Sequence, residues 1–232
     1  MLLWIIPVVM ILVFSMAFLI YVLQYYRADE EAHVALEPDE TVSVKETDYG
    51  WLFDGPSEDD ALIFYPGGKV EETAYAPLLK DLARQGMDVC LVRMPFHLAV
   101  FGANKANDVM AQHDYPRWYI GGHSLGGAMA ANYAAEHGEQ ISGVYMLASY
   151  ATKPLNENTR ATVIYGSEDG VLNMTKLEEG NQYLPNGSKT YVIEGGNHAQ
   201  FGNYGIQAGD GDALISAEEQ QRRTVELILQ NK

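Results

Sequence analysis

The chain has 232 residues, enough for one well-buried domain, and it shows no internal repeat of solenoid length. Its formal net charge is −16 and every acidic residue lies after position 28, which argues against a nucleic-acid partner. The single cysteine, Cys90, excludes an intramolecular disulfide, and its apolar neighbours indicate a structural thiol in a buried strand.

The N-terminal segment is apolar. No charged residue occurs from Leu2 to Leu23, and a helix of that length reaches about 33 Å, enough to cross the hydrocarbon core. Aromatic residues flank both ends, so we predict a single-pass transmembrane anchor over residues 1–27. The alternative is a cleaved signal peptide, which normally has a basic start and a shorter apolar core. Arg27 is the only basic side chain near the span, so charge says little about orientation; we expect the domain on the outer face.

The residues after the anchor divide into a linker and a domain. Residues 28–40 are polar and acidic and are expected to form a linker, and residues 41–232 the catalytic domain. Alternating runs at 41–47 and 50–53 predict an antiparallel pair of strands. The continuous apolar run at 61–65 is typical of a strand covered on both faces.

Strand and helix patterns then alternate along the chain. Helices are expected at 71–85, at 128–137 and after Ser216, and further strands at 87–92, 118–120, 143–148, 161–165 and 190–193. This alternation predicts an α/β fold with a mostly parallel sheet and helices on both faces. The apolar stretch 94–101 lacks a clean period; we favour a buried crossover over an acyl-pocket wall or partial lid.

A glycine-flanked serine marks a candidate nucleophile. Gly122-His123-Ser124-Leu125-Gly126 follows a predicted strand and precedes a predicted helix, the context that a nucleophile elbow needs. A sharp strand-to-helix turn holds the serine in a strained conformation, and small residues two before and two after let the chains pass closely. We therefore predict Ser124 as the nucleophile.

A serine hydroxyl needs a base, and the base needs an orienting acid. In this type of site the chain order is serine, acid, histidine, and His198 follows the last predicted strand in a glycine-rich loop. The acid should end the strand at 161–165, where Glu168 and Asp169 are adjacent. We prefer Asp169, which falls three residues after the glycine that ends the strand, and expect Glu168 to face solvent.

The oxyanion formed during acyl transfer needs two backbone N–H donors. One should be Leu125, directly after the nucleophile, and the other should come from the loop after the 61–65 strand. Glycine permits close approach there, so we name Gly68 first and Lys69 second. No cofactor and no metal are expected, because Asp210-Gly211-Asp212 lacks the remaining oxygen ligands of a calcium loop.

Together, the elbow, the Pro66-Gly67-Gly68 loop, the Gly166–Gly170 acid turn and the Gly196–Gly202 base loop resemble the α/β-hydrolase superfamily. The likeness runs from about Val42 to the C-terminus and is strongest to the small single-domain branch related to dienelactone hydrolases. A segment from Tyr204 to Asp212 is similar to a loop of that branch. Dienelactone hydrolases themselves use cysteine as nucleophile, where this sequence has Ser124.

These features predict a serine hydrolase that acts on a small carboxylic ester or thioester through an acyl-enzyme. The same triad also serves peptidases and acyltransferases, because the pocket selects the acceptor. A different class of function is a catalytically silent fold that binds a ligand, but all three members of the triad are present in the sequence.

Overall fold

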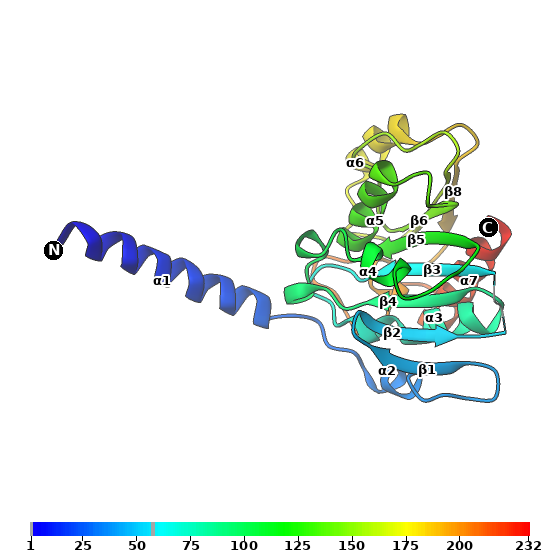
Figure 1. Cartoon of the computed structure of the whole chain (residues 1–232), viewed down its shortest axis with the longest axis horizontal. Helices are drawn as coiled ribbons and strands as arrows, with labels where there is room; N and C mark the ends of the chain where they lie inside the picture. The colour runs from blue at the N-terminus through cyan, green and yellow to red at the C-terminus, as the bar shows by residue number, and fades with distance from the viewer. Residues whose placement is uncertain (1, 57–58) are drawn as a thin grey trace.

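Eight strands form one sheet in the computed structural model, which describes residues 2–56 and 59–232, with side chains from Ile6 onward (Figure 1). The strands are β1 (Ser43–Thr47), β2 (Gly50–Asp54), β3 (Asp60–Tyr65), β4 (Asp88–Val92), β5 (Arg117–His123), β6 (Gly143–Leu147), β7 (Arg160–Gly166) and β8 (Lys189–Ile193). Their order is β1-β2-β4-β3-β5-β6-β7-β8. The entry strands β1 and β2 are antiparallel, as expected, and β4 to β8 run parallel with β3.

The helices lie before, between and after these strands. They are α1 (Leu2–Leu23), α2 (Glu30–Val34), α3 (Ala76–Arg84), α4 (Ala106–Met110), α5 (Leu125–Glu136), α6 (Met174–Gly180) and α7 (Ala217–Gln230). Short 3-10 turns are η1 (Glu72–Tyr75), η2 (Pro95–His97), η3 (Ala99–Phe101), η4 (Asn181–Tyr183) and η5 (Ala199–Phe201).

Both faces of the sheet are buried. Along β3 the side chains alternate, so that Leu62 and Phe64 pack with α3 and α7 while Ala61 and Ile63 pack with α5. A strand covered on both sides needs apolar residues throughout, which explains the unbroken apolar run. Cys90 lies in the second of these layers, and burial raises the pKa of its thiol to about 12. The predicted fold class is confirmed.

Two predicted elements differ from those observed. The helix expected at 71–85 is divided into η1 and α3, with Pro77 in the first turn of α3, a position that needs no N–H donor. The helix expected at 128–137 begins at Leu125, directly after the elbow. Gly126 and Gly127 are poor helix formers and hide that start in the sequence.

The stretch 94–101, expected to be a buried crossover, is buried only in part, at Met94, Leu98 and Ala99. It forms η2 and η3, and the side chains of Phe96, Val100 and Phe101 are about half exposed, at 51%, 49% and 53%. Phe96 has a left-handed backbone with φ of 57°. The turns break any strand or helix period and turn apolar side chains outward.

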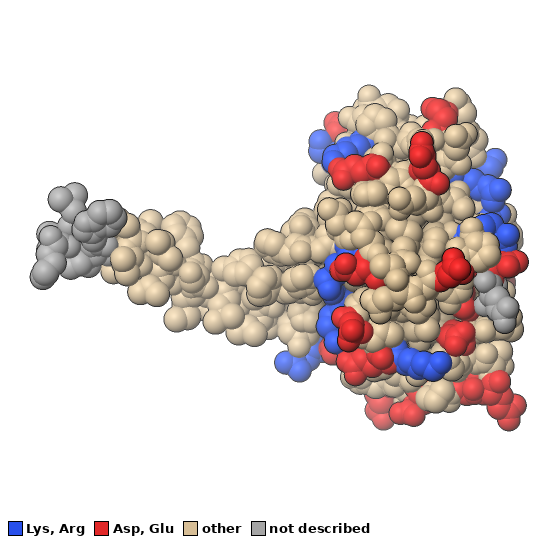
Figure 2. All heavy atoms as spheres, in the orientation of Figure 1, with Lys and Arg blue, Asp and Glu red and all other residues tan. Residues whose placement is uncertain are grey.

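Helix α1 extends away from the domain and is uncharged, as Figures 1 and 2 show. Within the described chain it is the one helix long and apolar enough to cross a membrane. Its last turn touches the domain, where Val22 is 5% exposed, and it leaves the domain on the side where the parallel strands end (Figure 1). By length and composition this is a membrane helix or a signal sequence.

The chain directly after α1, residues 24–29, is called the exit segment below, and it is docked on the domain. Tyr26 donates its N–H to the carbonyl of Lys69 at 2.8 Å, and its carbonyl accepts from the N–H of Glu71 at 2.9 Å. Asp29 caps α2, in which Ala32 is fully buried. The segment 28–40, expected to be a linker, therefore packs against the domain instead of standing free.

Candidate active site

Ser124 occupies a strained turn between β5 and α5. Its φ and ψ are 51° and −122°, outside the regions that a serine ordinarily adopts. The turn is tight because a Cβ on Gly126 would lie 2.2 Å from the carbonyl oxygen of Tyr65, and one on Gly122 would lie 2.5 Å from the same atom. The hydroxyl of Ser149 donates to the carbonyl of Ser124 at 2.8 Å and fixes the turn from the other side.

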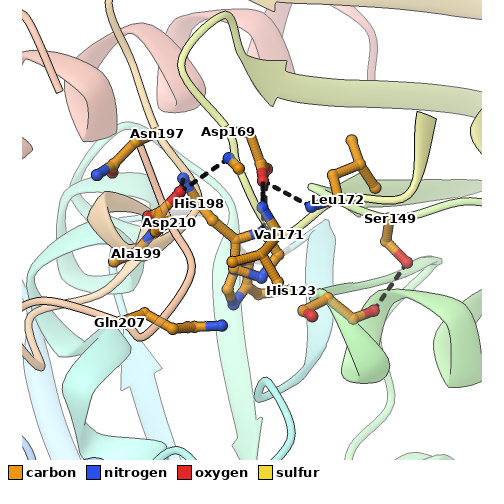
Figure 3. Close-up of polar contacts among 12 residues, drawn as sticks. His123, Ser149, Asp169, Val171, Leu172, Asn197, His198, Ala199, Gln207 and Asp210 are labelled. Atoms are coloured by element: carbon orange, nitrogen blue, oxygen red, sulfur yellow. Dashed lines mark hydrogen bonds and ion pairs between the residues drawn. The ribbon is translucent and has the colours of Figure 1, made fainter. Parts of the chain in front are cut away.

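His198 and Asp169 face each other across the ends of β7 and β8 (Figure 3). Nδ1 of His198 lies 2.9 and 3.1 Å from the two carboxylate oxygens of Asp169, and both side chains are 1% exposed. Asp169 Oδ1 also accepts backbone N–H bonds from Val171 at 2.9 Å and Leu172 at 2.7 Å. These bonds hold the carboxylate in place and satisfy it as an anion.

Glu168, the other acidic candidate, points elsewhere. Its carboxylate accepts from the hydroxyl of Ser167 at 2.8 Å, and only its backbone N–H turns inward, to the carbonyl of Gly196 at 2.8 Å. The structure thus brings Asp169, and not Glu168, to the imidazole.

The outer nitrogen of the imidazole has no partner. Among the side chains that the structure describes, Nε2 of His198 is buried and makes no hydrogen bond. His198 lines a cavity of about 250 Å³ that is also lined by Ser124, Leu125, Leu172 and Asn173. The candidate base and the candidate nucleophile therefore line the same cavity.

Asp210 fixes the base loop, a role that the sequence analysis did not assign. Its carboxylate accepts the backbone N–H groups of His198 at 3.1 Å and Ala199 at 2.8 Å (Figure 3). It also accepts from Gly170, next to the acid, at 3.1 Å and from Gly211 at 2.9 Å. One carboxylate therefore ties the base loop to the acid loop.

Helix α7 also holds the base loop in place. Gln220 is fully buried; its amide oxygen accepts from the N–H of Asn197 at 2.9 Å, and its amide nitrogen donates to the carbonyl of Asn197 at 2.8 Å. Two glutamines, Gln220 and Gln221, lie on the buried stripe with Val225 and Ile228. In the sequence, two glutamines at positions of the helix that otherwise carry apolar residues were the signal that this helix has a polar contact to make.

His123, inside the elbow, lies beside the candidate base. The centroids of its ring and that of His198 are 4.5 Å apart. Burial, and then the neighbouring His198, hold the pKa of His123 well below its ordinary value, so it stays neutral. Tyr75 Oη accepts from the N–H of Gly67 at 3.0 Å and is hydrogen-bonded to Nδ1 of His123 at 2.8 Å. This chain of bonds joins the loop after β3 to the elbow.

The loop after β3 approaches the start of α5. A Cβ on Gly68 would lie 2.9 Å from Cδ2 of Leu125, so the two candidate oxyanion donors are neighbours. Lys69, the second choice, already donates its N–H to the carbonyl of His97 at 2.8 Å. Gly68 therefore fits the role better. Among the residues with described side chains, no group of three or more His, Cys, Asp or Glu is placed to hold a metal ion.

Comparisons with known proteins agree with the fold. Solved structures with a similar fold include a dienelactone hydrolase from Anabaena variabilis, at 12% identity and a TM-score of 0.57, covering 84% of this chain and 99% of that one. Naproxen esterase from Bacillus subtilis has 12% identity and a TM-score of 0.59, with coverage of 86% and 94%. A bacterial membrane phospholipase A has 12% identity and a TM-score of 0.60, and covers 100% of both chains.

In sequence, no curated protein matches the chain significantly. A family model does match: that of the alpha/beta hydrolase family, over residues 61–222. This match spans more than half of the chain and includes the elbow, the acid turn and the base loop. The chain belongs to the alpha/beta hydrolase family.

Proposed function

We propose that the protein is a serine hydrolase that cleaves a carboxylic ester or thioester through an acyl-enzyme. The observation that carries the proposal is the buried pair of His198 and Asp169: Nε2 of His198 has no described partner, and His198 lines the same cavity as Ser124. Such a pair has no evident structural use, because burying an unpaired polar nitrogen costs stability.

The proposed reaction has two halves. Ser124 Oγ attacks the carbonyl carbon while His198 Nε2 takes its proton, and the N–H groups of Leu125 and Gly68 stabilise the oxyanion. Collapse breaks the bond to the alcohol or thiol, which leaves with that proton. Water then attacks the acyl-enzyme, His198 takes a proton from it and returns it to Ser124, and the carboxylic acid departs.

The surroundings suit these steps. Asp169 stabilises the imidazolium that forms twice per turnover, and neutral His123 beside it adds no competing positive charge. Water as the acceptor gives hydrolysis; another alcohol or an amine would make the same site an acyltransferase, and an amide substrate would make it a peptidase. We propose the ester or thioester.

We also propose that α1 is an uncleaved single-pass anchor with the domain on the outer face. The exit segment is docked on the domain from Tyr26 onward, so the chain next to α1 is not the extended, accessible strand that a processing enzyme needs. Among the residues that directly follow α1 in the sequence, only Arg27 is basic. The cluster of basic residues that is typical of a cytoplasmic flank is missing there.

The test of the hydrolase is covalent labelling by a fluorophosphonate, together with release of p-nitrophenol from p-nitrophenyl acetate. Ser124→Ala should abolish both, while Ser43→Ala, a matched change on strand β1, should leave both unchanged. Undiminished labelling of the Ser124→Ala chain would show that another residue is the nucleophile. Absence of both activities from the unaltered chain would contradict the hydrolase proposal.

A further inference from the structure

Exposed apolar side chains gather at the edge of the sheet that carries the candidate active site. Phe96, Val100 and Phe101 follow β4, Met174 follows β7 and Ile206 follows β8; their exposed fractions run from 43% for Met174 to 93% for Ile206. The carboxyl ends of parallel strands share one edge, so these five side chains, called the apolar rim below, lie on the same edge of the sheet as the candidate site. Elsewhere in the described domain, Val34, Val192 and Leu214 are the large apolar side chains with comparable exposure.

The apolar rim is continuous with helix α1. The ring of Phe18 lies edge-on to Phe96 at 5.4 Å and to Phe101 at 6.0 Å between centroids. Phe18 lies five residues before the end of α1 at Leu23, which is about 7.5 Å along the helix axis. If α1 spans the bilayer, these two aromatic side chains reach the boundary between headgroups and acyl chains, the depth at which amphipathic segments lie.

Cations and tyrosines mark the level of the headgroups just outside this depth. Lys69 Nζ lies 4.2 Å from the centroid of the Tyr21 ring, and the guanidinium of Arg27 lies 5.3 Å from that of Tyr25. Aromatic rings with long basic side chains are typical of the membrane–water interface. Lys69 directly follows Gly68, so the proposed oxyanion loop lies at this same level.

The connection from the oxyanion loop to the membrane helix is short. The exit segment reaches Tyr26, which bonds to Lys69 and Glu71, within three residues of Leu23, a span of at most about 10 Å. Leu98, between the exposed aromatic residues, lies 3.7 Å from the Cβ position of Gly68. Buried Leu98 thus joins the segment that carries Phe96 and Phe101 to the proposed oxyanion loop.

The cavity itself is too small for a long acyl substrate. At about 250 Å³ it is smaller than the pockets of roughly 300 to 1,000 Å³ that enclose drug-sized ligands. It accommodates the ester group and a few neighbouring atoms, so the rest of a long chain must lie outside, against apolar surface. The apolar rim offers such a surface.

We infer that the apolar rim seats the active site on the bilayer and that the substrate is a long-chain acyl ester drawn from the membrane, with its chain along Phe96 and Phe101. This inference rests on the proposed hydrolase function and gives it a substrate class. Its occupant is lipid: an apolar face touching a membrane helix is covered by the acyl chains that surround that helix.

The test compares one chromogenic group in two settings. The full-length protein is placed in vesicles of ether-linked phosphatidylcholine, which contains no acyl ester, and is given either p-nitrophenyl palmitate in the bilayer or p-nitrophenyl acetate in water. Phe96→Asn with Phe101→Asn should lower the ratio of the palmitate rate to the acetate rate by tenfold or more. Asparagine tolerates the left-handed backbone at residue 96. Val34→Asn with Val192→Asn, on apolar positions outside the rim, should change the ratio by less than twofold.

Labelling by a fluorophosphonate reports whether each variant is folded. Phe101→Trp keeps an aromatic ring at the interface and should retain the ratio of the two rates, which gives a second test if the double variant misfolds. A ratio that is unaffected by the rim variant, or is lowered equally by the control, overturns the inference. An unaltered chain that cleaves the acetate but not the palmitate also overturns it. Failure of the unaltered chain on both esters and in labelling would instead overturn the underlying hydrolase function.

Discussion

Replacing Asp210 by asparagine tests whether the base loop is held by one carboxylate. The two oxygens of Asp210 accept N–H bonds from His198, Ala199, Gly170 and Gly211. Asparagine keeps one acceptor oxygen and turns an amide NH₂ group toward at least one of these donors. One charge-assisted bond is lost, at about 1.5 to 3 kcal/mol, and the others weaken as the charge disappears. We expect about 2 to 4 kcal/mol of lost stability, which a domain of ordinary stability survives.

The expected effect on catalysis is larger than this loss suggests. A displacement of about 1 Å in a reacting group can cost about 100-fold, so kcat should fall by roughly 10- to 100-fold if the His198 imidazole shifts. The assays are p-nitrophenyl acetate turnover and the rate of fluorophosphonate labelling, both at a temperature where thermal melts show the variant folded. Asp212→Asn is the matched control, because Asp212 accepts none of the four bonds. A lower Tm with an unchanged labelling rate would refute the positioning role and leave Asp210 a structural residue.

Two further predictions concern carboxylates. Asp169→Asn should lower kcat for p-nitrophenyl acetate by about 10³- to 10⁴-fold, because the amide cannot stabilise the imidazolium. Glu168→Gln should change kcat less than threefold. A larger loss in Glu168→Gln than in Asp169→Asn would contradict the assignment of the acid. Burial raises the pKa of Asp88 to about 6 from 3.8, so the stability linked to its protonation is full below about pH 4 and is lost as pH rises through 6. The Tm of the unaltered chain should therefore fall relative to that of Asp88→Asn between about pH 4 and 6 and change little above about pH 7, and parallel curves would contradict the prediction.

The sequence located the residues of the candidate site, which the structure brings together, better than it located the elements around them. Ser124, Asp169 and His198 each follow a strand within a short glycine-containing loop, and such signals are local, so each was visible alone. The start of α5 was missed because glycines needed for the tight elbow are poor helix formers. The choice between Asp169 and Glu168 depended on which adjacent side chain turns inward, and that direction is set by backbone bonds to Val171 and Leu172.

The sequence did not predict which segments far apart along the chain pair with one another. The exit segment pairs Tyr26 with Val70, and no local period marks residues that are so far apart along the chain. The acidic composition of residues 28–40 suggested a solvated linker, because composition reports charge and not the hydrogen bonds that fix a segment. Glu31, for example, accepts from the side-chain amide of Asn203 at 3.1 Å.

The docked exit segment changes where the folding unit begins. A soluble form cut at the first strand, β1, would remove the backbone bonds that Tyr26 makes on both sides of Val70 and would leave Ala32 out of the core. The loop carrying Gly68 would then lack its neighbouring chain on one side. We propose that the smallest autonomous enzyme begins near Gln24, and that a foreign membrane helix can replace α1 only if it joins ahead of that residue. Only two residues, Gln24 and Tyr25, separate the end of α1 from the backbone bonds that Tyr26 makes to the loop carrying Gly68.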